Sequence, residues 1–403
     1  MISKKLFLAV SVALLGACTL GPNYTRPDLA LDAQYRGAQL ADAQARSVSD
    51  IAWSALFQDP ELTALLQRAV ERNLDLKVAL VRIEAARAQN GIVRSYFLPT
   101  VSGSLSNAPN PSASSDSSYS LGAVLNWELD IFGKVRRENQ AAMAELLATE
   151  DGARAVMASL VATTTSTWLN LRALDQELAI TKANIVSQEE SLALVRSLLK
   201  GGVANGADEQ QAIAQLAFTR SRQPQIEQAI VATENALSLL LGAQPGPIIR
   251  DTAAAMPQTP ALPKTGLPSE LLARRPDVSA AEQLLVAATA RIGVAIANRF
   301  PVPTIGLSGF IGLIGINLGD TLGNDGATQS VTSWGPDMVL PLIDWGRANN
   351  RVRGARANAE IAALNYRSIV LNALREVSDA LTATDKVALV IEQNEIRTKA
   401  GIE

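Results

Sequence analysis

Two stretches of the sequence, LDIFGKVRR at residues 129–137 and LIDWGRANN at residues 342–350, are imperfect copies of one another. Gly133 of the first stretch aligns with Gly346 of the second. Self-similarity at a fixed spacing indicates that one supersecondary unit occurs more than once in the chain. The fold is therefore expected to consist of two related halves.

The likeness continues upstream of these stretches. Residues 72–104 parallel residues 274–308, and Pro99 aligns with Pro303. Each copy predicts the same order of elements, which is a helix, two strands and a long helix.

The repeat also sets the expected domain boundaries. We expect a signal peptide at 1–17, an acylated N-terminal segment at 18–58, a first repeat at 59–242, a Pro-rich linker at 243–268 and a second repeat at 269–403. The linker contains six prolines, a composition typical of an extended, semi-rigid spacer.

Long helices are predicted on either side of the strands. Residues 134–200 contain no proline and one glycine, and at 1.5 Å per residue such a helix would be about 100 Å long. Further helical stretches are expected at 59–97, at 205–241 and from 348 to about 399, with an interruption or kink at Pro224.

Short runs of alternating apolar and polar residues lie between the helices, at 100–107, 120–127, 303–312 and 332–341. A run of about ten residues has the length of a tilted membrane strand, although a soluble hairpin fits the alternation equally well. Closed membrane barrels need about eight strands or more. If the strands span a membrane, several chains must therefore share one barrel.

The N-terminus has the pattern of a bacterial lipoprotein signal. Two lysines precede a short apolar run at 6–15, and LLGAC at 14–18 ends on the single cysteine of the chain, Cys18. The Cys18 thiol would carry a diacylglycerol, and the freed amine would carry a further acyl chain. An ordinary secretory signal with a chance cysteine is the alternative.

Composition argues against several other classes of protein. The chain has no histidine and one cysteine, which removes the commonest general base and any intrachain disulfide. The net charge of −3 provides no basic surface for nucleic acid. Hydrophobic residues make up 48% of the chain but aromatic residues only 4%, a mixture that favours long packed helices.

Four stretches resemble one known family. They are CTLGPNYTRP at 18–27, WELDIFGKVRR at 127–137, LLARRPDVSAAEQ at 271–283 and PLIDWGRANNR at 341–351. The chain resembles the TolC-like outer-membrane efflux family, and within it the lipoproteins of the NodT type. The resemblance covers nearly the whole chain in the expected order.

The resemblance implies a mainly α chain with a four-stranded membrane β segment, assembled as a homotrimer. Three subunits would build a twelve-stranded β-barrel in the outer membrane and a long α-helical barrel in the periplasm. The family acts as the exit duct of tripartite pumps, together with a periplasmic adaptor (membrane fusion) protein and an inner-membrane transporter of the resistance–nodulation–division type. It conducts small molecules passively, so the resemblance implies no enzyme activity and no cofactor apart from the lipid on Cys18. Thr19 after the cysteine points to the outer membrane, by the family's habit.

A further segment, LLKGGVANGADEQ at 198–210, resembles the tip of the family's helical hairpin. In the family this tip meets the adaptor, and the resemblance assigns that contact to Gly201, Gly202, Val203 and Ala204. A plain helix–helix turn would use the same glycines.

The second repeat lacks a counterpart of this tip and of the helix that returns from it, because the chain ends at Glu403. We therefore expect a chain truncated before its second tip, which does not form a sealed channel.

Two other readings remain open at the level of sequence. A non-channel structural or adaptor-type periplasmic lipoprotein would use the helices as a scaffold. An enzyme with paired carboxylates would use Glu128, Asp130 or Asp344, although capping carboxylates are common at strand–helix junctions.

Overall fold

The computed structural model describes residues 19–30, 59–109, 117–254, 256, 274–299, 302–315, 318–323 and 329–400. The predicted lipidation site, Cys18, and most of the predicted Pro-rich linker lie outside these residues.

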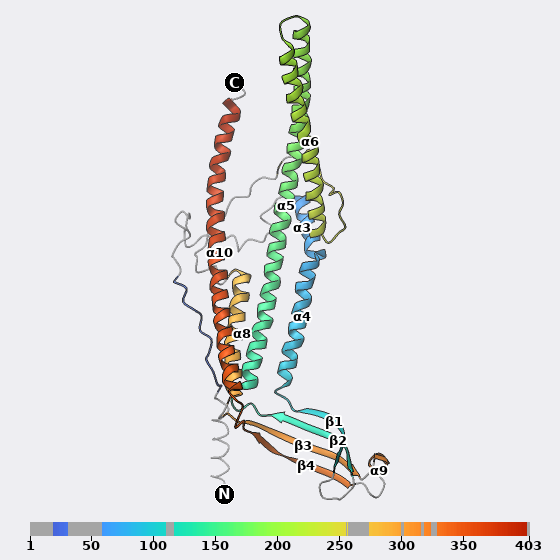
Figure 1. Cartoon of the computed structure of the whole chain (residues 1–403), viewed down its shortest axis with the longest axis vertical. Helices are drawn as coiled ribbons and strands as arrows, with labels where there is room; N and C mark the ends of the chain where they lie inside the picture. The colour runs from blue at the N-terminus through green and yellow to red at the C-terminus, as the bar shows by residue number, and fades with distance from the viewer. Residues whose placement is uncertain are drawn as a thin grey trace. The chain divides into compact units, whose positions relative to one another are not determined.

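The described chain is mostly helical, with four strands in two pairs (Figure 1). Its helices are α3 (Pro60–Arg72), α4 (Leu74–Ser95), α5 (Lys134–Lys200), α6 (Gly206–Leu240), α8 (Pro276–Ala297), α9 (Leu318–Gly323) and α10 (Arg347–Ala400). Its strands are β1 (Thr100–Pro109), β2 (Ser117–Glu128), β3 (Thr304–Gly315) and β4 (Gln329–Val339). The predicted fold class, a mainly α chain with four strands, is confirmed.

Helix α5 agrees with its prediction in full, whereas helix α6 differs from its prediction at Pro224. Helix α5 has the predicted bounds and runs for 67 residues. Helix α6 continues through Pro224, so the expected interruption does not occur. A proline removes one intrahelical hydrogen bond, and the buried side chains of Leu216 and Ile226 hold the helix on both sides of it.

The helical stretch predicted over 59–97 forms two helices, because the chain breaks at Asn73. The Asn73 backbone leaves the helical region with ψ of 132°. Its side-chain oxygen accepts from the Leu76 amide at 2.9 Å, and its side-chain nitrogen donates to the Leu240 carbonyl at 3.0 Å. Asn73 thus starts α4 and ties it to the end of α6.

The strands form one sheet in the order β1-β2-β3-β4, and every neighbouring pair is antiparallel. Within the hairpins Thr100 pairs with Asn126 and Thr304 with Val339. The hairpins join through β2 and β3, where Glu128 lies opposite Gly306. The outer edges of β1 and β4 have no partner strand within the sheet.

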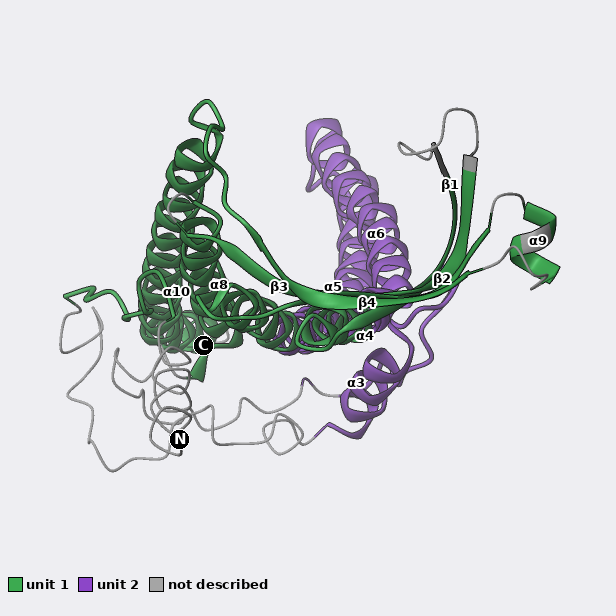
Figure 2. Cartoon of the chain, turned by 90° about the horizontal axis from the view of Figure 1, so that it is seen from below, with its two compact units in different colours: residues 1–35, 82–151, 271–403 green, residues 36–81, 152–270 purple. Residues whose placement is uncertain are grey.

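The chain separates into two compact units, and each draws on segments far apart in sequence (Figure 2). Unit 1 comprises residues 1–35, 82–151 and 271–403, and unit 2 comprises residues 36–81 and 152–270. The sheet belongs to unit 1, and the hairpin of α6 with the second part of α5 belongs to unit 2.

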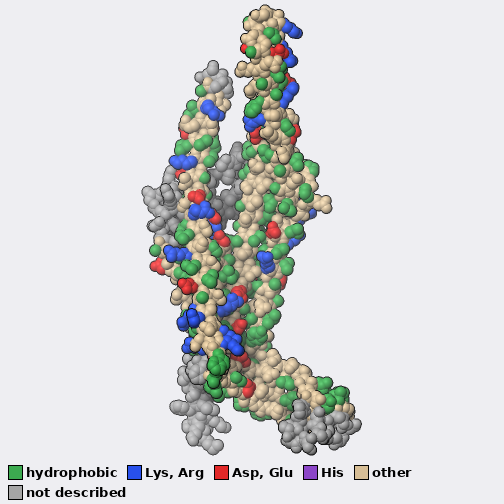
Figure 3. All heavy atoms as spheres, viewed as in Figure 1, with side chains coloured by type: hydrophobic (Ala, Val, Ile, Leu, Met, Phe, Trp, Pro, Cys, Tyr) green, Lys and Arg blue, Asp and Glu red, His purple; other side chains and the backbone are tan. Residues whose placement is uncertain are grey.

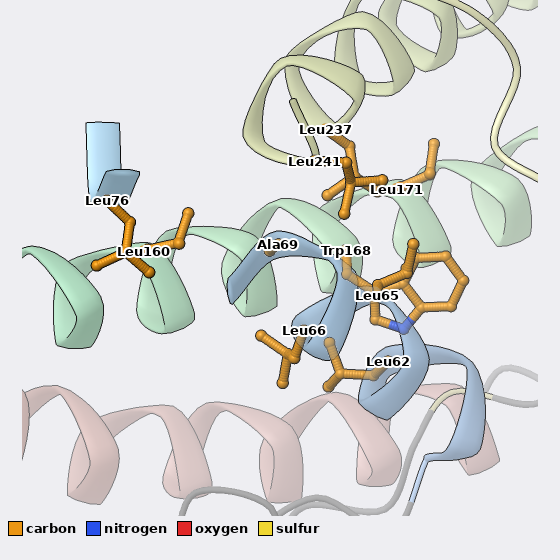
Figure 4. Close-up of a cluster of buried hydrophobic side chains, with 10 residues drawn as sticks. All are labelled: Leu62, Leu65, Leu66, Ala69, Leu76, Leu160, Trp168, Leu171, Leu237 and Leu241. Carbon is orange, nitrogen blue, oxygen red and sulfur yellow. The ribbon is translucent and has the colours of Figure 1, made fainter. Parts of the chain in front are cut away.

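The core of unit 2 gathers around Trp168 of α5 (Figure 4). Its buried members are Leu62, Leu65, Leu66, Ala69, Leu76, Leu160, Trp168, Leu171, Leu237 and Leu241. The Trp168 indole N–H donates to Asp59 at 2.9 Å, and the other Asp59 oxygen accepts from two amides that begin α3. The core therefore also fixes the start of a helix.

In unit 1 helix α8 packs against α10 and against the first part of α5. Val278, Ala281 and Leu285 contact buried residues of α10, and Ala287 and Ala290 meet alanines of α5. Within the described residues α8 alone is long and apolar enough to cross a membrane. Because α8 is packed against two helices of unit 1, its apolar composition is that of a core helix.

Candidate functional site

The register of the sheet places large apolar side chains on one of its faces. These are Val101, Leu105, Leu121, Leu125, Trp127, Leu307, Ile311, Leu313, Trp334 and Met338. The opposite face carries most of the serine and asparagine side chains, together with Val124, Phe310 and Ile314. Trp334 is 80% exposed and Val101 is 68% exposed. A face of this kind, exposed to water, would carry a large hydrophobic cost, whereas lipid would cover it without that cost.

The strands contain very few charges. Glu128, the last residue of β2, and Asp337 of β4 are the only charged side chains in the four strands. In the view of Figure 3 the charged side chains lie mainly over the helices. The alternation predicted for the strands is thus combined with the low charge that a lipid-facing sheet requires.

Residues 19–30, which we call the anchor segment, are bound tightly to unit 1. The Leu20 amide donates to the Phe132 carbonyl at 3.2 Å. Arg137, which is buried, donates to the Leu20 carbonyl at 3.1 Å and to the Asn23 side chain at 2.8 Å. Burial lowers the pKa of Arg137 from its ordinary value.

Two glycines of unit 1, at which a side chain would clash with the anchor segment, allow that segment to lie close to β2, α5 and α8. A β-carbon at Gly133 would lie 2.7 Å from Thr19. Gly293 of α8 would clash in the same way with the Leu20 carbonyl, at 2.6 Å. Gly133 follows β2 and precedes α5, so residue 19 lies at the strand–helix junction.

The far end of the anchor segment binds Glu282 of α8, which is 8% exposed. Arg26 donates to both Glu282 oxygens, at 2.8 and 2.7 Å, and the Tyr24 hydroxyl donates at 2.8 Å. Burial, followed by this hydrogen bond, raises the pKa of Tyr24. Three donors therefore satisfy one buried carboxylate.

The carboxylates considered as catalytic candidates are bound within the chain. Asp130 accepts from two backbone amides in the first turn of α5, both at 2.9 Å. Asp344 accepts from the Ala348 amide at 2.7 Å, which lowers the pKa of Asp344. Glu128 accepts from Lys134 at 3.0 Å. These contacts are those of helix caps and an ion pair, and the described residues contain no group of three or more potential metal ligands.

The predicted tip lies at the reversal between α5 and α6. Gly202 has φ of +72°, in the left-handed region that favours glycine. The amides of Val203 and Ala204 donate to the Leu198 carbonyl at 3.0 and 3.3 Å, which closes the end of α5. Gly201 lies beside Gly202 in the same turn, and the Val203 side chain is 78% exposed.

The hairpin below the tip is held by its own contacts. Asn205 and Asp208 form a reciprocal capping box at the start of α6. Ile185, Leu192 and Leu216 form a small buried cluster between the two helices. The turn at the tip is therefore carried by two helices that pack against each other.

A buried ion network in unit 2 was not predicted from the sequence. Arg250 donates to both oxygens of Asp175 at 2.7 Å and to Glu234 at 2.5 Å. Arg172 lies 3.4 Å from Asp175 and donates to the Asp251 carbonyl at 2.5 Å. The network fastens the segment after α6 to α5, and its arginine–carboxylate spacings give no local signal in the sequence.

Comparisons with known proteins agree with this architecture. A family model described as outer membrane efflux protein matches residues 65–243 and 267–395. The outer membrane protein OprJ of Pseudomonas aeruginosa is 35% identical over 395 residues, covering 94% of this chain and 80% of OprJ.

Solved structures agree as well. The outer-membrane channel OprN superposes with a TM-score of 0.81 at 31% identity, covering 94% of this chain and 86% of that one. The open-state outer membrane channel MtrE of Neisseria gonorrhoeae gives a TM-score of 0.81 at 27% identity, covering 95% and 86%. The chain belongs to the outer membrane efflux protein family and has the TolC-like fold of an outer-membrane channel.

Proposed function

We propose that three copies of this chain form a lipid-anchored duct that carries small toxic molecules from a periplasmic pump to the cell exterior. The observation that carries the proposal is the sheet of unit 1. It has a low charge, an apolar face that is continuous across four strands, and two open edges.

The open edges require other chains. Unpaired strand edges are not tolerated in lipid, and about eight strands or more are needed to close a barrel. With four strands per copy, the twelve-stranded trimer implied by the family resemblance meets this requirement.

The contacts of the anchor segment support lipidation at Cys18. Thr19, the next residue, lies against Gly133 at the end of the strands. Acyl chains on residue 18 would therefore start beside the membrane-facing sheet, where they could enter the same bilayer.

The exposed hairpin tip supports the proposal that the chain has protein partners. Gly201, Gly202, Val203 and Ala204 form an exposed reversal, which we assign to the periplasmic adaptor protein. The adaptor would connect the duct to an inner-membrane transporter of the resistance–nodulation–division type. Relatives named for antibiotic, solvent and toluene efflux support small toxic compounds as the cargo.

The decisive experiment is to express the full chain in a Gram-negative host that lacks its own efflux channel. We expect outer-membrane fractionation, a trimeric mass in detergent and stepwise conductance in planar bilayers. Metabolic labelling with palmitate should mark the wild type and not Cys18→Ser. A monomer in the periplasm would support the non-channel lipoprotein instead, and a trimer without conductance would support a non-conducting subunit.

A further inference from the structure

Unit 1 contains a half-open cavity of about 420 Å³, which we call the wall pocket. Its volume lies within the range of small-molecule sites. Four helices line it, and much of the lining is apolar. The apolar part comes from Val93 of α4, Ala141 and Ala142 of α5, and Val294 and Ala295 of α8.

Four charged side chains also line the wall pocket, two of each sign. Arg291 of α8 forms an ion pair with Glu145 of α5. Glu138 of α5 and Arg351 of α10 line the same pocket, and neither forms an ion pair within the part of the chain that the structure describes. One negative and one positive charge are therefore open to a ligand in one pocket.

The wall pocket lies on the face of α8 that points away from the anchor segment. Gly293 of α8 contacts the anchor segment, whereas Arg291 and Ala295, each two residues away, line the pocket. Successive residues of an α-helix are turned by about 100°, so residues two apart point in nearly opposite directions. In the proposed duct the lipid-bearing anchor segment lies outside, and the wall pocket therefore faces the bore.

A neighbouring cavity of about 460 Å³ leads to the same assignment. Its lining includes Thr100, Asn126 and Thr304, which lie on the face of the sheet that carries the serine and asparagine side chains. Glu138 lines this cavity as well as the wall pocket. The polar face of the sheet, which faces the bore in the proposed duct, thus continues into the wall pocket.

We infer that the wall pocket is a transient binding site in the wall of the duct for small zwitterionic amphiphiles. The inference rests on the proposed function and names a class of cargo that the duct holds on its way out. The ammonium group of the ligand binds Glu138 and its carboxylate binds Arg351. Its apolar part packs against Val93, Ala142 and Val294.

A zwitterion matches these charges better than a ligand with a single charge. A cation alone would bind Glu138 and leave Arg351 without a partner, and an anion alone would do the reverse. Arginine binds carboxylates through two parallel hydrogen bonds, which favours a carboxylate at Arg351. Glu138 is half-buried and Arg351 is exposed, so the ligand can also leave, as conduction requires.

Three dansyl probes that share one fluorophore test the charge preference. Dansyl-lysine, modified on its side chain, carries an ammonium group and a carboxylate. Dansylcadaverine carries the ammonium group alone, and dansyl-aminohexanoate carries the carboxylate alone. Fluorescence anisotropy measures binding to the purified full chain in an uncharged detergent, with the detergent alone as baseline. We expect dansyl-lysine to bind about tenfold more tightly than either singly charged probe, because it makes one more charge-assisted contact.

Substitutions at the two open charges separate recognition from a structural effect. Glu138→Gln should weaken binding of dansyl-lysine and dansylcadaverine about tenfold and leave dansyl-aminohexanoate unchanged, whereas Arg351→Gln should show the opposite selectivity. The matched controls are Glu84→Gln, an exposed carboxylate of unit 1, and Arg353→Gln, two residues from Arg351 and on the other side of α10. Both controls should bind all three probes as the wild type does.

Planar bilayer recording tests whether the wall pocket faces the bore. Dansyl-lysine added to the bath should cause brief partial blocks of the wild-type conductance. Glu138→Gln should reduce the frequency or the duration of these blocks about tenfold, in line with its loss of affinity.

The outcomes separate the binding site from the duct. Binding that responds to neither substitution overturns the site, and binding that responds without any block of the current overturns its position in the bore. In both cases a steady wild-type conductance without probe leaves the proposed duct standing. A wild type that forms neither a trimer nor a conducting pore overturns the duct and the inference together.

Discussion

Asp175 is the residue on which the ion network of unit 2 depends. It is 3% exposed in its side chain and binds Arg250 through both oxygens, with Arg172 beside it. The hydrogen bonds from Arg250 to Asp175 are the largest cause that raises the pKa of Arg250. Both arginine side chains are nearly as buried as Asp175, at 3% and 5% exposure.

Asp175→Ala should therefore destabilise unit 2 by about 3–5 kcal/mol, because it leaves two buried guanidinium groups without their shared carboxylate. Thermal unfolding followed by circular dichroism measures the effect. The matched control is Glu177→Ala, which removes an exposed partner of Arg222 and should cost about 0–1 kcal/mol. Equal losses of stability in the two variants would contradict the claim that burial makes the Asp175 contacts stronger.

The tip offers a second test at the scale of single residues. Gly202→Ala forces a side chain into the left-handed region and should cost about 1–2 kcal/mol of hairpin stability. Gly201→Ala, one residue earlier, meets only ordinary contacts with backbone oxygens and should be nearly neutral. Hydrogen exchange of the Ser197–Gly206 amides distinguishes the two variants, and equal protection in both would refute the conformational argument.

Some of these residues could be predicted and others could not. The glycines of the tip and of the repeat were identified because left-handed turns restrict the residue type so strongly. Arg250 and Glu282 were missed because their partners lie 75 and more than 250 positions away. A single sequence gives no signal for pairs at such distances, since surface and buried arginines look alike.

At the scale of elements, the anchor segment is held at two points, Arg137 near its start and Glu282 near its end. Glu282→Gln should loosen the second point, because the strongest acceptor for Arg26 is lost and a charge-assisted hydrogen bond is worth about 1.5–3 kcal/mol. Faster hydrogen exchange in residues 24–30, with unchanged exchange in α5, would be the result. Unchanged exchange in residues 24–30 as well as in α5 would show that packing alone holds the anchor segment.

The same contact predicts a pH dependence with a defined sign. Tyr24 has a raised pKa in the folded chain, so its contribution to stability is complete below the ordinary tyrosine pKa of about 10 and falls as pH rises above it. Tyr24→Phe should lose this dependence while losing about 1 kcal/mol for one hydrogen bond. Melting temperatures of both proteins between pH 8 and 11 provide the measurement, and parallel curves would contradict the assignment.

The hairpin tip is tested as an element through its partner. Val203→Glu should weaken adaptor binding, because it places a charge on a side chain that is 78% exposed and supports no core. The trimeric mass should stay unchanged, and site-specific cross-linking to the adaptor should fall together with drug resistance. Loss of the trimer would instead assign Val203 to assembly.

Elements were easier to predict than their ends and breaks. The bounds of α5 followed from a long stretch without proline. The break at Asn73 was missed because asparagine is tolerated inside many helices, and here tertiary contacts with Leu240 and Leu76 decide the conformation. Pro224 shows the converse, since packing maintains a helix that local preference would interrupt.

At the scale of the whole molecule, the single chain exposes apolar helix surface that an assembly of copies has to cover. Among the described residues, the last part of α10 exposes Val387, Leu389, Val390, Ile391 and Ile396. Uncovered apolar faces of this kind favour leakage or association. Planar bilayer recording of purified trimers decides between the two, because the proposed duct gives a steady, discrete conductance and a leaking assembly gives an irregular one.

The membrane role of the sheet makes the two faces unequal in every assembled copy. Ile311 lies on the apolar face and is 62% exposed, whereas Ser308 of the same strand lies on the opposite face. Ile311→Arg should cost about 2–4 kcal/mol of membrane insertion if its site faces the middle of the bilayer, whereas Ser308→Arg should be accommodated in a water-filled bore. The measurement is the fraction of heat-modifiable protein in the outer membrane for each variant. Equal losses would mean that the two faces share one environment, as they would in a soluble sheet, and the lipid-facing assignment would then be wrong.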